Sequence, residues 1–304
     1  MNLRDLDYIC AVAEYLHFGK AAEACNVSQP TLSGQIKKLE ALLGVTLFER
    51  GPKNVRVTQT GEDIISIAKE AQDAVRRIRS VSEASKDPLA GHINLGLIPT
   101  IAPYLIPLFV EHIKTGLPNL SLTYNEDITE RLTRDLLDGK LHGAILATPP
   151  ETDGLEAIPL YSEPFWIIFD KDHQLENKTA IAMKDVPNDD ILLLTDGHCF
   201  RDQALSICHP QPSQKGQSLR ATSLETLINL VAAGQGVTLI PALVSENGLA
   251  SNPHLRLRPL SDKNAARTIY LTYRKRYPRV EALRALGGII VANLPKSVKV
   301  LTPT

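Results

Sequence analysis

From His92 to the end of the chain, stretches typical of β-strands alternate with stretches typical of helices, and no other feature constrains the fold as strongly. Such alternation predicts parallel or mixed sheets with helices packed on their faces, and about 210 residues of it suit two lobes with a cleft between them. The predicted strands are Ile93–Leu97, Leu120–Tyr124, Gly143–Ala147, Phe165–Phe169, Ile191–Leu194, Val237–Ile240 and Thr268–Tyr273, and the clearest helices are Leu224–Ala233 and Val280–Ala292.

The first 60 residues have a different pattern, which predicts a small helical domain. A first helix is indicated by apolar residues at steps of three and four, and a short second helix covers Lys20–Ala24. A tight turn at residues 25–27 leads to Ser28, a good N-cap, and Pro30 follows where a missing N–H does little harm. The third helix buries a stripe of leucine and isoleucine residues and ends at Gly44. Two helices, a short turn and a capped third helix form the helix-turn-helix pattern.

The outward face of the third helix is suited to DNA. Gly34, in the middle of that face, allows a close approach to a groove, and Thr31 and Gln35 offer hydrogen bonds to base edges. Residues 45–49 and 55–58 flank a turn-rich stretch and predict a small hairpin, or wing. Residues 29–57 carry five basic and two acidic side chains, a local charge of +3 in a chain of net charge −1. Phosphate contact depends on this local excess, although a three-helix bundle with a solvated polar face fits the same pattern.

Residues 61–83 predict a helix with a heptad seam, which consists of Ile64, Ala68, Ala71, Val75 and Ile78. Because no obvious globular partner lies nearby in the sequence, we expect this helix to pair with a second copy of itself. A packed surface helix is the alternative. The run Lys86-Asp87-Pro88 then breaks the helix and predicts a hinge.

The motif Ala21-Ala22, Ser28-Gln29-Pro30-Thr31-Leu32-Ser33, Leu39-Glu40, Leu43-Gly44 and Leu47-Phe48-Glu49-Arg50 resembles the signature of the LysR-type transcriptional regulators. The resemblance implies an α/β protein with a winged helix-turn-helix domain at 1–60, a linker helix and hinge at 61–87, and a two-lobed regulatory domain at 88–304, like the periplasmic binding proteins. It also implies a homotetramer, a dimer of dimers, that binds double-stranded promoter DNA and works with RNA polymerase. The expected DNA-contacting residues are Ser28, Gln29, Pro30, Thr31, Ser33, Gln35, Lys37, Lys38, Arg50 and Lys53.

The N-terminus carries acids among its apolar residues, so it does not predict a signal peptide, and no apolar stretch is long enough for a membrane span. We therefore expect a cytoplasmic protein, in which the four cysteines begin as thiols. Cys10 and Cys25 lie on or beside packed helical faces and are expected to be structural. Cys199 and Cys208 lie in a segment with richer chemistry.

Asp196-Gly197 predicts a turn, and the run after it has helix-forming composition, which places Cys199 near a helix N-terminus. The partial positive charge there, with Arg201 and His198 close by, favours a thiolate, the form that attacks the O–O bond of a peroxide. If residues 199–208 form one helix, nine steps of ~1.5 Å separate the two Cα atoms by roughly 13 Å. A disulfide needs about 4.4–6.8 Å, so these cysteines can bond only if the helix is dismantled.

Three interpretations of this segment remain open at the level of residue chemistry. Both cysteines could be small buried hydrophobes, or His198, Cys199, Cys208 and His209 could be zinc ligands, although their spacing is unusual for zinc. The third interpretation is a redox sensor. Here the run Gly197–Ala204, with Cys208 nine residues after Cys199, resembles the redox segment of the hydrogen-peroxide-sensing LysR-type regulators. Further similar runs are Gly96–Thr100, Arg220–Thr226 and Val231–Gly234.

That resemblance implies that Cys199 is the peroxidatic cysteine and Cys208 the resolving one. It places the peroxide pocket at Thr100, Thr129, His198, Asp202 and Arg267, assigns no role to His209, and implies no metal or other cofactor. We therefore expect a regulator that detects hydrogen peroxide through a reversible disulfide, controls antioxidant genes and is reset by a cellular dithiol. The alternatives are a metabolite-responsive regulator with an organic acid between its lobes, and a thiol peroxidase.

Overall fold

The computed structural model describes residues 1–50, 55–84, 87–195, 199–208, 220–246, 248–262 and 265–301. It divides into two compact units, Met1–Ser82 and Glu83–Thr304. None of the helices in these ranges is long and apolar enough to cross a membrane.

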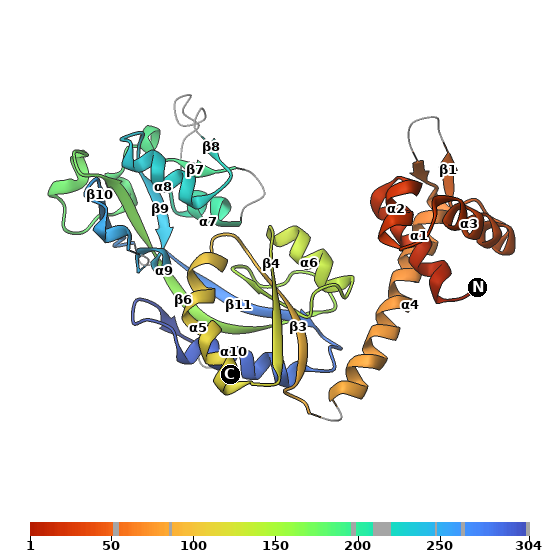
Figure 1. The fold of residues 1–304 in the computed structure, drawn as a ribbon. Helices are drawn as coiled ribbons and strands as arrows, with labels where there is room; N and C mark the ends of the chain where they lie inside the picture. The colour runs from red at the N-terminus through yellow and green to blue at the C-terminus, as the bar shows by residue number, and fades with distance from the viewer. Residues whose placement is uncertain are drawn as a thin grey trace. The chain divides into compact units, whose positions relative to one another are not determined.

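The N-terminal unit contains three helices and a two-stranded sheet (Figure 1). The helices are α1 (Leu3–Tyr15), α2 (Phe18–Ala24) and α3 (Gln29–Leu43), and β1 (Phe48–Arg50) pairs antiparallel with β2 (Val55–Val57). Helix α2 begins two residues before the predicted position because His17 caps it: Nδ1 of His17 accepts hydrogen bonds from the backbone of Gly19 and Lys20. The predicted helix-turn-helix and wing strands are confirmed.

The third helix has the predicted ends. The Ser28 hydroxyl accepts a hydrogen bond from the Thr31 backbone, and Gly44 ends α3 with a φ of +70°, a conformation that favours glycine. One oxygen of Glu40 accepts hydrogen bonds from the backbone N–H groups of Leu47 and Phe48, at 2.8 and 3.2 Å. This acidic side chain therefore fixes the first wing strand against α3.

Helix α4 (Gln59–Ala84) covers the predicted linker helix. The expectation that it has no globular partner is wrong for its first half, because Ile65 and Ala68 lie in the core of the N-terminal unit and Ala71 packs against it. Ile65 and Ala68 belong to the same buried cluster as apolar residues of α1 and α3. Farther along, Ile78 is 70% exposed and so leaves the end of the seam uncovered.

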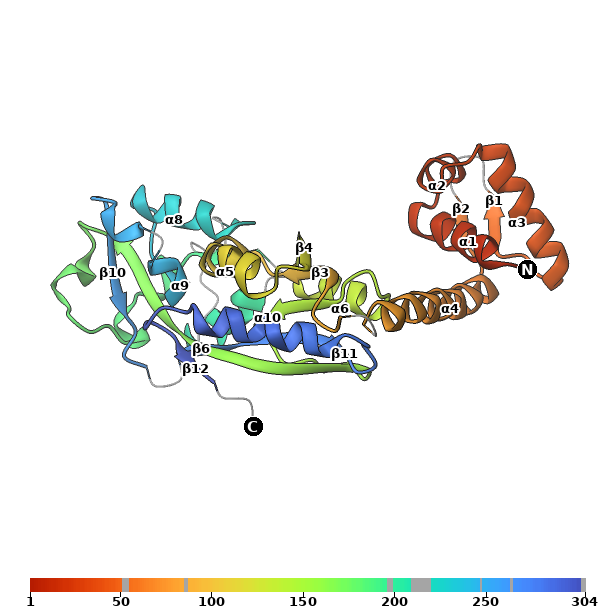
Figure 2. The same cartoon turned by 60° about the horizontal axis from the view of Figure 1, so that its bottom comes forward.

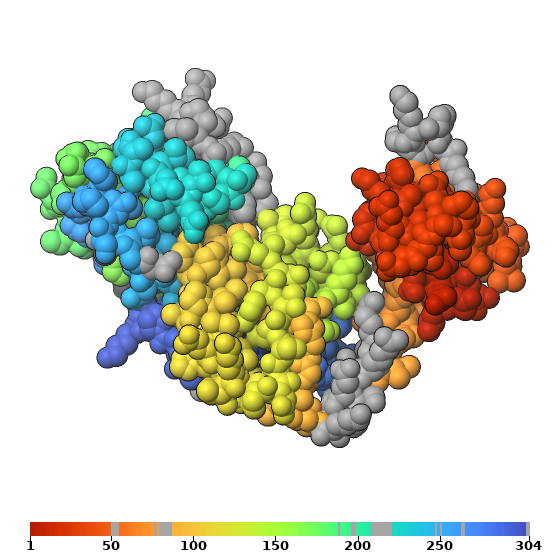
Figure 3. All heavy atoms as spheres, in the orientation of Figure 1, coloured from red at the N-terminus to blue at the C-terminus, as the bar shows by residue number. Residues whose placement is uncertain are grey.

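The C-terminal unit is built on a mixed sheet, as predicted. In its first lobe β3 (Gly91–Leu97) runs parallel to β4 (Leu120–Glu126) and β5 (Gly143–Leu146), and β11 (Ala266–Arg274) runs antiparallel to β5. Helices α5 (Ala102–Gly116) and α6 (Thr129–Leu137) lie at the surface of this lobe, yellow and yellow-green in Figure 3, and α10 (Val280–Ala292) packs against α5. Helix α10 has the bounds that the sequence predicts.

Strand β6 (Leu155–Asp170) connects the two lobes and is much longer than the predicted Phe165–Phe169. Its first part pairs with β11 and with β12 (Lys299–Val300), and its end pairs with β9 (Thr238–Pro241) and β10 (Leu255–Pro259). Pro159 lies where the register with β11 shifts, and a bulge is one of the few places in a sheet that tolerates proline.

The second lobe contains the helix that begins at Cys199 and ends at Cys208. Strand β7 (Leu193–Leu194) precedes α7 (Cys199–Cys208), and β8 (Arg220–Ala221), α8 (Leu224–Ala232) and the short α9 (Ala242–Ser245) follow. The short helices η1 (Gln174–Asn177), η2 (Met183–Asp185), η3 (Asn188–Asp190) and η4 (Leu249–Ser251) connect strands. A mixed α/β unit with two lobes confirms the predicted fold class.

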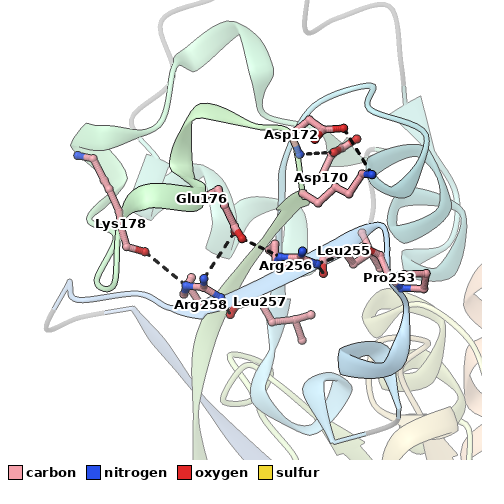
Figure 4. Close-up of polar contacts among 10 residues, drawn as sticks. Asp170, Asp172, Glu176, Lys178, Pro253, Leu255, Arg256, Leu257 and Arg258 are labelled. Carbon is pink, nitrogen blue, oxygen red and sulfur yellow. Dashed lines mark hydrogen bonds and ion pairs between the residues drawn. The ribbon is translucent and has the colours of Figure 1, made fainter.

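Strand β10, which the sequence pattern did not predict, is held at the edge of the second lobe by charged side chains (Figure 4). Nε of Arg256 lies 2.9 Å from one oxygen of Glu176, and a nitrogen of Arg258 lies 3.6 Å from the other. Arg258 also donates a hydrogen bond to the backbone oxygen of Lys178. These contacts join β10 to the η1 segment and have a structural role.

Candidate functional site

A buried arginine joins four segments of the C-terminal unit. The side chain of Arg267, on β11, is 1% exposed, and its Nε donates to a carboxylate oxygen of Glu163 on β6 at 2.9 Å. Its other nitrogens donate to the hydroxyl and the backbone oxygen of Thr100, at 2.9 and 3.1 Å. The second oxygen of Glu163 accepts a hydrogen bond from the Leu243 backbone at 2.8 Å. Both charges of this buried pair are therefore compensated, which burial of an ion requires.

The same arginine supports the first turn of α7. Its guanidinium carbon lies 5.5 Å from the ring centroid of Phe200, within the range of a cation–π contact. Phe200 also meets Phe165 edge to face, with centroids 5.4 Å apart. Because Phe200 follows Cys199 directly, the position of the cysteine depends on these two aromatic contacts.

A small cavity of about 10 Å³ lies next to Cys199. Its lining residues are Ile98, Pro99, Thr100, Ile128, Thr129, Cys199 and Phe200. The hydroxyl oxygen of Thr129 is buried and has no hydrogen-bond partner. This space is on the scale that one water molecule needs, and it is far below the roughly 300 Å³ of the smallest usual organic-ligand pockets.

The electrostatics of this cavity favour negative charge. Cys199 is the first residue of α7, Thr129 is the first residue of α6, and Thr100 lies two residues before α5. Helix N-termini carry partial positive charge and unpaired N–H groups, so three of them near one cavity stabilise a hydroxide that leaves there.

Helix α7 is held to its surroundings by its own side chains. The amide nitrogen of Gln203 donates to the backbone oxygen of Ala147, just after β5, at 2.8 Å, while the amide oxygen is buried without a partner. A guanidinium nitrogen of Arg201 donates to the backbone oxygen of Leu194 at 3.1 Å. Cys199 and Cys208 lie at opposite ends of this helix, as the sequence predicts.

Three of the expected pocket residues come together. Thr100 and Thr129 line the cavity with Cys199, and Arg267 reaches it through Thr100 and Phe200. Asp202 is exposed on α7 and is not among the lining residues. His198, and the side chain of Cys208, lie outside the described part of the chain.

Sequence reasoning missed Glu163 and Gln203 as parts of this site. Glu163 is the buried acid of β6, and its only sequence signal is that a charge within a buried strand needs a partner. Gln203 belongs to the motif that suggested the redox segment, but its contact with Ala147 spans 56 residues, so no local pattern predicts it.

In the described ranges no group of three or more histidine, cysteine, aspartate or glutamate residues is placed to hold a metal ion, and two of the four suggested zinc ligands, His198 and His209, fall outside those ranges. Cys25 is half-buried in the N-terminal unit. Burial, and then the nearby charge of Asp7, raise the pKa of its thiol, which lowers its reactivity at neutral pH.

The predicted DNA-contacting face of α3 is open. Ser28, Gln29, Pro30, Thr31, Lys37 and Lys38 are exposed, and Ser33 and Gln35 are half-buried. A Cβ atom built on Gly34 meets nothing within 4 Å, so this face allows close approach. The side chain of Arg50 and all of Lys53 lie outside the described residues.

Family models match both units. Residues 3–62 match a bacterial regulatory helix-turn-helix protein of the lysR family, and residues 86–295 match a LysR substrate binding domain. The chain belongs to the LysR family of bacterial transcriptional regulators. As a LysR-type regulator it combines a DNA-binding helix-turn-helix with a sensing domain, which fits the open face of α3 in one unit and the cysteine cavity in the other.

LysR-type relatives with a named function are similar over nearly the whole chain. A hydrogen peroxide-inducible genes activator from Dickeya chrysanthemi is 40% identical over 91% of both chains. A cysteine-to-aspartate variant of full-length OxyR from Pseudomonas aeruginosa is 34% identical over 100% of this chain and 99% of its own, with a TM-score of 0.79. A hydrogen-peroxide-bound cysteine-to-serine variant of OxyR from Corynebacterium glutamicum is 34% identical over 96% and 92%, with a TM-score of 0.65.

Proposed function

We propose that this LysR-type protein is an activator that senses hydrogen peroxide through Cys199 and Cys208. The observation that carries the proposal is the water-sized cavity between Cys199 and the unpaired hydroxyl of Thr129. Hydrogen peroxide is only one oxygen atom larger than water, and it both donates and accepts hydrogen bonds. The named relatives, which include a peroxide-bound structure, support the same chemistry.

In the first step, peroxide binds between Cys199 and the threonine hydroxyls. The Cys199 thiolate attacks one peroxide oxygen, an S–O bond forms, and the O–O bond breaks. The cysteine becomes a sulfenic acid, and hydroxide leaves and takes up a proton to become water. The three helix N-termini stabilise the leaving hydroxide, and Arg267 fixes Thr100 and Phe200 around the reacting atoms.

In the second step, the Cys208 thiolate attacks the sulfenic sulfur. An S–S bond forms and hydroxide leaves, so that one peroxide and two thiols become one disulfide and two waters. Within α7, nine residue steps separate the two Cα atoms by roughly 13 Å, so the helix must come apart for this bond to form. Phe200 then leaves Phe165 and Arg267, and Gln203 leaves Ala147.

The rearranged segment alters how regulatory domains pack against each other, and this change reaches the DNA-binding domains through the linker helices. The domains are 1–60 for DNA, 61–87 for linker and hinge, and 88–304 for sensing. The active form is a homotetramer, a dimer of dimers, and the exposed Ile67 and Ile78 on α4 offer apolar contact for pairing. It works in the cytoplasm on promoters of antioxidant genes with RNA polymerase, and a cellular dithiol resets it.

At promoter DNA, the start of α3 reads base edges and the basic residues Lys37, Lys38, Arg50 and Lys53 contact phosphates. In the sensing domain His198, Asp202 and Arg267 complete the peroxide pocket with the two threonines. The protein reports peroxide and is not a turnover enzyme, since a thiol peroxidase has no use for a helix-turn-helix. The cavity beside Cys199 also disfavours an organic acid as its ligand, on size alone.

The test is transcription from a target promoter after mild peroxide, with wild type, Cys199→Ser and Cys10→Ser. We expect Cys199→Ser to abolish induction and Cys10→Ser, the matched control in the N-terminal unit, to keep it. Full induction by Cys199→Ser overturns the proposal. In Cys208→Ser, sulfenic acid should accumulate on Cys199 or oxidise further.

A further inference from the structure

A second cavity system lies in the first lobe, between α10 and the beginning of β6, and shares no lining residue with the Cys199 cavity. Figure 2 shows α10 running along β6, with β12 beside it. The larger cavity, about 770 Å³, is mainly apolar and includes Ile158, Leu160 and Val291 in its wall. Its volume falls within the roughly 300–1,000 Å³ of small-molecule sites.

A smaller, more polar cavity of about 370 Å³ adjoins the larger one, because Tyr273 and Arg284 line both. Burial raises the pKa of the Tyr273 hydroxyl, and the charges of Glu156 and Arg284 also act on it, so these three side chains lie near one another at the junction between the cavities. The two cavities therefore form one groove with an apolar arm and a polar end. That is the shape of a site for an amphipathic molecule.

The polar end contains two arginines, the buried Arg279 and the exposed Arg284. Arg279 is 2% exposed, and it donates only to backbone oxygens, those of His92 and Ala90, while its Nε is buried without a partner. Neither Arg279 nor Arg284 has an ion-pair partner in the described ranges of the chain. A buried guanidinium without a carboxylate carries a desolvation cost that a nearby anion lowers.

Two more features define the ligand. Glu156 and Glu281 also line the polar end, and their charges oppose a second negative charge, so a monoanion fits better than a dianion. On the apolar side, a Cβ atom built on Gly288 of α10 meets nothing within 4 Å, although a glycine inside a helix costs about 1 kcal/mol relative to alanine. Gly288 therefore opens space along the apolar arm.

We propose that this groove binds an amphipathic monocarboxylate, such as a medium-chain fatty acid or an aromatic acid. The apolar tail lies in the larger cavity and packs against Ile158, Leu160 and Val291. The carboxylate lies at the junction, where Arg284 donates to it and the charge of Arg279 stabilises it. This site is separate from the peroxide chemistry and does not depend on it.

The test is calorimetric titration of the reduced full-length protein with octanoate and with 1-octanol, which has the same chain length but no charge. We expect saturable octanoate binding, weakened about tenfold or more by Arg284→Gln, while 1-octanol binds weakly and is unaffected by that change. Arg131→Gln, on the exposed surface of α6, is the matched control and should bind octanoate like wild type.

A second set of variants tests the proposal by filling the apolar cavity. Gly288→Leu should abolish binding of both probes, and because leucine favours helix it should leave the melting temperature intact. If that variant does not fold, Val300→Trp, which narrows the groove from β12, replaces it. Absence of octanoate binding at millimolar concentration overturns the proposal, and so does octanoate binding that both Arg284→Gln and Gly288→Leu leave unchanged. In either case peroxide oxidation of Cys199 is unaffected.

Discussion

Glu163→Gln is the substitution that most directly tests whether the buried arginine organises the sensing unit. Glu163 and Arg267 are 0% and 1% exposed, and each carboxylate oxygen of Glu163 accepts a hydrogen bond. Glutamine keeps one acceptor for the Leu243 N–H but turns an N–H donor, or a neutral oxygen, toward Arg267. The arginine is then left buried without its counter-charge.

Removing one partner of a buried ion pair costs about 3–5 kcal/mol. Arg267 keeps its hydrogen bonds to Thr100 and its contact with Phe200, so we expect the lower end of that range. In a unit of this size 1 kcal/mol shifts the melting temperature by about 2–4 °C, which predicts a fall of roughly 6–12 °C.

The assay is thermal unfolding followed by tryptophan fluorescence. Trp166 is the one tryptophan of the chain and lies on β6, so the signal reports on the C-terminal unit. The matched control is Glu130→Gln, which makes the same chemical change in an exposed pair with Arg134 on α6. Such pairs contribute about 0.3–0.5 kcal/mol, or roughly 1–2 °C. If Glu163→Gln lowers the melting temperature no more than Glu130→Gln does, the reasoning about the buried pair is refuted.

Three further predictions concern DNA binding, the helix α7 and stability at alkaline pH. If Lys37 contacts phosphate, Lys37→Gln should reduce the slope of log affinity against log salt concentration by about 0.9. The control Lys114→Gln, on α5, should leave that slope unchanged. Equal slopes for Lys37→Gln and wild type contradict the contact. Gln203→Leu removes a hydrogen bond worth about 1 kcal/mol that holds α7 to the backbone of Ala147. The rate of disulfide formation after peroxide should therefore rise about fivefold in stopped-flow measurements. An unchanged rate contradicts the idea that this hydrogen bond restrains α7. Burial, chiefly, raises the pKa of Tyr104 from 10.0 to about 12, so its contribution to stability is complete below pH 10 and is lost as pH rises toward 12. Between pH 9.5 and 11.5 the melting temperature of Tyr104→Phe should therefore fall less than that of wild type. Equal falls in melting temperature contradict this prediction.

Local signals were sufficient for the N-terminal unit. Ser28 and Gly44 fix the two ends of α3 through contacts within a few residues, and those contacts are found as expected. The linker helix was predicted but its environment was not, because Ile65 and Ala68 pack against residues far back in the sequence. A heptad pattern identifies an apolar face and does not identify what covers that face.

In the C-terminal unit, the length of β6 and the partners of Arg267 depend on contacts between residues far apart in the sequence, so local patterns do not predict them. Pro159 and Pro164 argue against a long strand, yet β6 runs through both because a register shift accommodates Pro159 and both lobes pair with the same strand. Thr100, Glu163 and Arg267 meet across 104 to 167 residues. Resemblance to a family identified two of the three, and only the fold revealed Glu163 as the partner of Arg267.

The proposed switch is one covalent event, a disulfide between the two ends of α7, and peptide mapping under non-reducing conditions measures it directly. After mild peroxide, the fragment that carries Cys199 and Cys208 should be lighter by two hydrogen atoms, resist alkylation at both cysteines, and return to its original mass with dithiothreitol. If both cysteines remain open to alkylation at a peroxide dose that induces transcription, or if Cys199 links to another residue, the proposed switch is contradicted.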